Sequence, residues 1–104
     1  MKLIWENIAV EQLKQVSGYI YKSFGDNSKK AFLREIRRIV KLLNINPYIG
    51  ALDPFLSDRS KPYRTTIISG MDKMVYYIDT NGIIHISAFW DCRRNADNQT
   101  RHLL

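Results

Sequence analysis

The sequence of 104 residues has little cysteine and no long hydrophobic run. Its one cysteine, Cys92, excludes a disulfide within the chain, as is typical of proteins in a reducing cytosol. The apolar stretches fall well short of the roughly 20 residues that cross a membrane, and the one near the N-terminus is too short for a secretory signal. A chain of this length is most simply one domain, residues 1–104. We therefore expect a cytoplasmic, single-domain protein without a membrane partner.

The usual residue patterns for cofactors are also missing. The two histidines, His85 and His102, and Cys92 do not have the spacing of metal ligands. No glycine-rich loop of the kind that cradles phosphates is present. Cys92 has no obvious base beside it in the sequence, which speaks against a nucleophilic role. We expect no metal, no cofactor and no small-molecule ligand.

Acidic residues are in the minority. Sixteen Lys and Arg against ten Asp and Glu give a net charge of +6. At helical periodicity, four of the cations share one face and lie opposite an apolar face. These four residues, called the basic stripe below, are Lys30, Arg34, Arg37 and Lys41. Such a surface suggests an anionic partner, either nucleic acid or an acidic protein, and a merely solvated face is the alternative.

Hydrophobic periodicity predicts an α+β fold. The apolar spacing indicates two helices, near 8–24 and 28–45, and Gly25 between them is a typical helix stop. A strand is expected at 2–5, before the helices, and three more after them, at 63–68, 73–79 and 83–90. All three prolines lie in 47–62, which is expected to be a loop. The prediction is an N-terminal strand and an antiparallel helical hairpin on one face of a mainly antiparallel sheet of about four strands.

Alternation along the strands assigns side chains to the two sheet faces. In the last strand the helix-facing set is predicted to be Ile84, Ile86, Ala88 and Trp90, so that His85, Ser87 and Phe89 face away. Arg64, Lys73 and His85 are then expected to meet on the face without helices, with Arg93 at its rim. Several cations on one face suit a phosphate group. Taken singly, each of them can equally be a solvated surface residue.

The order and spacing of several segments resemble the RelE/ParE superfamily of bacterial toxin–antitoxin toxins. The segments are "AFLREIRRIV" in the second helix, "NPYIG" after it, and then "YRTTI", "KMVYYID" and "IIHISAFWDCRRN". The resemblance implies the same fold and a cognate antitoxin, which is expected to be acidic. It also implies one of two targets: RelE-like members cut mRNA on the ribosome, whereas ParE-like members poison DNA gyrase and are not nucleases.

For the nuclease hypothesis, the resemblance implies particular cations. Arg64, Lys73 and Arg93 match basic positions of the RelE-like cleft. The sequence departs from that pattern at Thr66, where a lysine is common, and at Gln99, near which an aromatic residue is common. His85 or His102 would move protons, since histidine titrates near neutral pH.

The basic stripe, with Arg94, would bind RNA phosphates. Arg94 could instead meet an acid on the antitoxin. The favoured hypothesis is therefore a metal-independent, ribosome-dependent mRNA endonuclease. The alternatives are a gyrase inhibitor and an inactive member that only binds its antitoxin.

Overall fold

A computed structural model describes residues 2–68, 72–91 and 100–103. Two helices are the largest elements: α1, Asn7–Phe24, and α2, Asp26–Ile45. The strands are β1 (Leu3–Trp5), β2 (Ala51–Leu52), β3 (Arg64–Ile68), β4 (Asp72–Ile78) and β5 (Ile84–Asp91). A short 3-10 helix, η1 (Pro54–Leu56), follows β2. The predicted order of elements is confirmed, with boundaries shifted by one or two residues.

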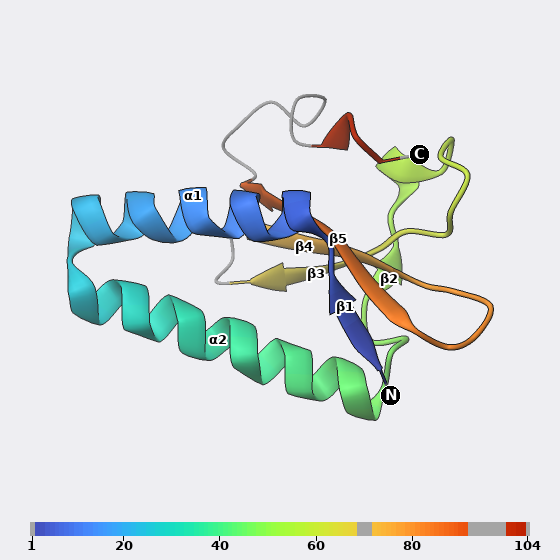
Figure 1. Cartoon of the computed structure of the whole chain (residues 1–104), viewed down its shortest axis with the longest axis horizontal. Coiled ribbons are helices and arrows are strands. Elements are labelled where there is room, and N and C mark those ends of the chain that lie inside the picture. The colour runs from blue at the N-terminus through green and yellow to red at the C-terminus, as the bar shows by residue number, and fades with distance from the viewer. Residues whose placement is uncertain (1, 69–71, 92–99, 104) are drawn as a thin grey trace.

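The five strands form one sheet in the order β1-β5-β4-β3-β2. β1 pairs in parallel with β5, and all other neighbours are antiparallel. α1 and α2 run antiparallel to each other and pack on one face of this sheet (Figure 1). The α+β prediction is thus confirmed. The fifth strand is β2, a two-residue strand inside the segment that was expected to be only a loop.

The helical hairpin packs through the two apolar stripes seen in the sequence. Gly25 joins the helices with φ 92°, a backbone conformation that glycine adopts without strain. The stripe of α2 is fully buried, and it consists of Phe32, Ile36, Ile39 and Leu43. In α1 the apolar spacing of the sequence continues to Phe24, but this side chain is 65% exposed. The reason is its place at the tip of the hairpin, where the helices extend past the sheet (Figure 1).

One irregularity in β5 changes the predicted faces of its last residues. Val75 pairs with Ala88, while the next residue, Tyr76, pairs with Ile86, so Ser87 is an extra residue in β5. A bulge of this kind reverses the alternation beyond it. Ile84 and Ile86 face the helices as predicted, but the core then continues with Phe89. The predictions for Ala88, Trp90 and Phe89 were therefore wrong, because strict alternation contains no bulge.

The sheet face opposite the helices is covered at its middle by a second core. Val75 and Ala88 from the sheet pack there against Leu56 of η1, Tyr63 and Leu103. η1 and residues 100–103 therefore lie over this face, near each other (Figure 1). Any site on this face must lie around that cover rather than in an open cleft.

Candidate functional site

Arg64 lies on the helix-side face of the sheet. Its neighbour across the strands is Tyr76, which belongs to the helix-side core. Nη1 of Arg64 donates a hydrogen bond to the carbonyl oxygen of Gly50 at 2.8 Å, and the guanidinium carbon lies 4.9 Å from the ring centre of Tyr48. Arg64 therefore fastens the segment after α2. Its predicted place beside Lys73 and His85 was wrong.

Tyr76 anchors the same segment through two further hydrogen bonds. The hydroxyl of Tyr76 donates to the carbonyl of Pro47 at 2.7 Å and accepts from the N–H of Gly50 at 2.9 Å. Burial raises the pKa of the Tyr76 phenol, whereas the hydrogen bond from the N–H of Gly50 and the nearby charge of Arg64 lower it by less. A side chain at position 50 would lie 2.7 Å from both the Thr65 carbonyl and the Tyr76 hydroxyl, so only glycine allows this approach.

Lys73 lies on the opposite face, as predicted. Its ammonium group is 4.8 Å from the ring centre of Trp90, the residue that pairs with it on β5. Trp90 in turn packs on Phe55 of η1, with ring centres 5.8 Å apart. The charge of Lys73 is thus held over an indole ring at the margin of the second core, where it gains a cation–π interaction.

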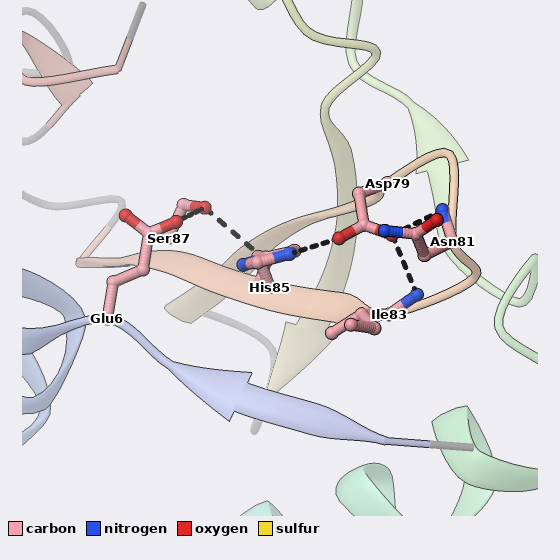
Figure 2. A network of polar contacts seen from close by, with 6 residues as sticks. All are labelled: Glu6, Asp79, Asn81, Ile83, His85 and Ser87. Atoms are coloured by element: carbon pink, nitrogen blue, oxygen red, sulfur yellow. Dashed lines mark hydrogen bonds and ion pairs between the residues drawn. The ribbon is translucent and has the colours of Figure 1, made fainter.

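His85 shares the face of Lys73 and belongs to a small polar network (Figure 2). Nε2 of His85 lies 2.8 Å from Oδ2 of Asp79, and an ionised carboxylate only accepts, so Nε2 carries a proton. The imidazole stacks on the ring of Tyr77 at 4.7 Å, with 5° between the planes. The ammonium group of Lys61 lies 5.0 Å from the centre of the same Tyr77 ring. These contacts fix the orientation of His85.

Asp79 connects this histidine to the β4–β5 turn. Its Oδ1 accepts from the backbone N–H groups of Asn81 and Ile83, at 2.8 and 3.0 Å (Figure 2). The hydrogen bond from His85 lowers the pKa of the Asp79 carboxyl, and the N–H of Ile83 lowers it further. Gly82 takes φ 80° in the same turn, which glycine adopts without strain, and its N–H donates to the carbonyl of Asp79 at 3.0 Å.

The other candidate residues are in different positions. Nε2 of His102 lies 2.7 Å from the carbonyl oxygen of Ser87, to which it donates. Thr66 is half-buried on the face of Arg64, across from Met74. Cys92, Arg93, Arg94 and Gln99 lie outside the described residues. Among the described candidates, the structure places Lys73 and His85 on one face and Arg64 on the other.

Two residues near His85 were missed by the sequence analysis. Asp79 directs its Nε2, and Tyr77 supplies the stacking surface. The signal for Asp79 was its position just before the Asn-Gly turn, because aspartate side chains often accept from backbone N–H groups two residues ahead. The role of Tyr77 depends on which residue faces it on β5, and therefore on the register.

The basic stripe is exposed along the outer face of α2. All four of its residues are exposed, while Phe32, Ile36 and Ile39 between them are buried. Lys30 forms an ion pair with Asp26 at 3.0 Å, and both side chains remain well exposed. Exposed charges of one sign on a helix attract an anionic surface in a salt-dependent way.

Two features are absent from the residues that the structure describes. No group of three or more His, Cys, Asp or Glu side chains there is placed to hold a metal ion. None of the helices in that part of the chain is both long and apolar enough to cross a membrane.

Together, these observations define a small α+β protein with a helical hairpin, a basic outer face and a fixed histidine opposite it. Residues 3–96 match the family model described as the ParE toxin of the type II toxin–antitoxin system parDE. The chain belongs to this family of toxins. Such a toxin has an antitoxin as its partner.

A solved structure supports the fold. A chain from the chromosomal ParDE toxin–antitoxin system of P. aeruginosa superposes with a TM-score of 0.69 at 20% sequence identity. The match covers 88% of this chain and 95% of that chain. No protein with a curated description is significantly similar.

Proposed function

We propose that this toxin acts in the cytoplasm by inhibiting DNA gyrase through a protein–protein contact, and not by cutting mRNA. One observation carries the proposal: those candidate residues of an RNA-cleaving cleft that the structure describes do not gather around one point. Arg64 faces the helices and is bonded to the carbonyl of Gly50, whereas Lys73 and His85 are on the opposite face. Cleavage by the RNA 2′-hydroxyl needs a base, an acid and cations around a single phosphate.

The remaining polar contacts point in the same direction. Nε2 of His85 already donates to Asp79, and Nε2 of His102 to the carbonyl of Ser87. Both histidines thus have structural partners. By contrast, the residues that dominate protein–protein interfaces are often aromatic, and Tyr19, Tyr21 and Phe24 are exposed on α1.

An mRNA endonuclease is the second candidate, because Lys73 and His85 do share a face. In this hypothesis Arg93 supplies the further cation at the end of β5, with Arg94 on the phosphate backbone. Asp79 would hold the His85 imidazole in place for proton transfer.

The antitoxin is proposed to be acidic and to cover the basic stripe of α2. Its charge would complement the four exposed cations of that face and the net charge of +6. The same surface would accept RNA phosphates if the ribosome were the target.

The test compares two activities of one purified preparation. DNA supercoiling by gyrase and mRNA cleavage on ribosomes are measured over the same range of toxin concentrations. We expect loss of supercoiling and intact mRNA. Lys73→Ala, His85→Ala and His102→Ala should leave the gyrase effect unchanged, provided that circular dichroism shows that they fold.

If mRNA is cut and gyrase is unaffected, the proposal is wrong. Arg93→Ala should then reduce cleavage about 10²–10³-fold, as loss of one transition-state donor does. If neither activity is seen but the antitoxin binds, the chain is an inactive, antitoxin-binding member.

A further inference from the structure

The edge of the sheet at β2 is exposed and apolar. β2 is the outermost strand on its side, and in the described part of the chain it pairs with β3 alone. Leu52 of β2 is 56% exposed, and Tyr48 and Ile49 just before the strand are exposed too. An exposed edge with apolar side chains is a template for a further strand.

A pocket lies directly beyond this edge. Its volume is about 500 Å³, and it is lined entirely by residues between Leu52 and Tyr63. Most of the lining is apolar, from Leu52, Pro54, Leu56, Pro62 and Tyr63. Because Leu56 and Tyr63 are anchored in the second core, this wall exists in the free protein.

Two residues that line this pocket each have a buried polar atom without a partner in the described part of the chain. Asp53 is only 8% exposed; its Oδ1 accepts from the N–H of Phe55, but its Oδ2 accepts nothing there. Arg59 donates through Nη1 to Asp58 at 2.9 Å, but its buried Nε is likewise unpaired. Unpaired buried groups are unfavourable, and an acceptor and a donor in one pocket suggest a missing ligand.

We propose that β2 and this pocket bind an extended segment of a partner polypeptide. An apolar side chain of the segment enters the pocket, and its flanking peptide groups reach Asp53 and Arg59. Peptide groups suit both atoms, since they supply an N–H for the carboxylate and a C=O for Nε–H. Main-chain pairing with the edge of β2 would add affinity, as in other cases of strand addition.

Charge favours an acidic segment. The chain carries +6, and Arg59 and Lys61 both line the pocket against the one carboxylate of Asp53. Acidic residues on either side of the apolar side chain would meet these cations at the pocket mouth. The binding of such a segment does not depend on whether gyrase or the ribosome is the target.

The experiment uses N-acetyl-leucine methylamide, which carries one apolar side chain between two peptide groups. Titrated into the ¹⁵N-labelled full chain, it should shift backbone amide signals of residues near 50–65. Asp53→Asn keeps an oxygen for the N–H of Phe55 but replaces Oδ2 with a donor, so affinity should fall about tenfold. Glu11→Gln is the matched control, because Glu11 is an exposed carboxylate on α1 that does not line the pocket. Its affinity should be unchanged.

A second variant and a second probe keep the test decisive. Leu52→Lys changes an exposed side chain, so the fold should survive while the probe binds at least about tenfold more weakly. A probe methylated on both amide nitrogens, N-acetyl-N-methyl-leucine dimethylamide, has no N–H to donate to Asp53 and should also bind about tenfold more weakly.

Several results would overturn the proposal. They are no shift at the solubility limit of the probe, shifts elsewhere in the chain, or equal binding by Asp53→Asn. Equal binding of 3-methylbutanol would mean that the pocket takes small apolar molecules, not peptide. Dimers of the chain that Leu52→Lys abolishes would make a second copy the occupant.

Discussion

The two faces of the sheet are stabilised in different ways. The helix-side face is a continuous apolar core in which strand residues such as Met74, Tyr76 and Phe89 pack under α1 and α2. The opposite face has a smaller core, covered by η1 and Leu103, and polar contacts surround it. Both histidines and Lys73 belong to this second face or its margin.

This difference shows where sequence change is costly. On the helix side, large buried side chains fill the core, so shortening them leaves cavities and lowers the stability of the protein. On the opposite face, hydrogen bonds and cation–π contacts orient the side chains, and much of their surface is exposed. Function is therefore more easily varied on the second face, while the first face maintains the fold.

The largest expected effect is at Phe89, on the helix side. Its ring is fully buried and packs edge-to-face on Phe32, with centres 5.7 Å apart. Phe89→Ala should lower the free energy of unfolding by about 3–5 kcal/mol, the usual cost of such a cavity. Phe55→Ala, on the opposite face and 45% exposed, should cost clearly less. Urea denaturation of both variants measures the contrast, and equal losses would contradict the division between the faces.

The next effect concerns the hydrogen bonds that anchor the segment after α2. Tyr76→Phe removes the hydroxyl that bonds both the N–H of Gly50 and the carbonyl of Pro47. Leaving these buried groups unpaired should cost about 1–3 kcal/mol in stability, measured by chemical denaturation. Tyr77→Phe is the control one residue further on, because its hydroxyl takes no part in these two bonds. If both variants lose equal stability, the hydroxyl of Tyr76 is not what holds this segment.

A third test asks whether the charged outer surface of α2 serves binding and not folding. Reversing all four charges of the basic stripe should weaken binding of an acidic antitoxin about tenfold or more at low salt. The loss should shrink as salt is added, since exposed charges are screened. The free energy of unfolding of the same variant should change little. Unchanged affinity at low salt would mean that the stripe is only solvated.

The smallest effect is a titration on the second face. His85 lowers the pKa of Asp79 through its hydrogen bond, so His85→Ala should raise that pKa towards the usual aspartate value of about 3.9. Because the folded pKa is depressed, the stability from this contact is present above about pH 4. It is lost as the pH falls through the folded value. NMR titration of the Asp79 carboxyl measures the change, and His102→Ala should leave it unaltered. An unmoved pKa in His85→Ala would contradict this role of His85.

The fold could be predicted from the sequence because apolar residues recur at clear helix and strand periods. The buried stripe of α2 and the glycine between the helices depend only on local spacing. The faces of β5 could not be predicted beyond Ser87, because a single extra residue reverses the alternation. That one residue moved Trp90 away from the helices, next to Lys73.

The candidate site was only partly predictable for a related reason. Lys73 and His85 share a face because strict alternation holds in their parts of β4 and β5. Arg64 was misplaced because its face depends on the pairing of β3 with β4, which alternation within one strand does not give. The pocket beyond β2 comes from the path of a loop, for which the sequence has no period.

The parallel pairing of β1 with β5 has a consequence for synthesis of the protein. Leu3 leaves the ribosome well before Ile84, the residue with which it pairs. At about 5–20 residues per second, the partner strand follows several seconds later. During this time β1 and the helical hairpin have no finished sheet to pack on. We expect the nascent toxin to remain incomplete, and therefore harmless, until β5 has been translated.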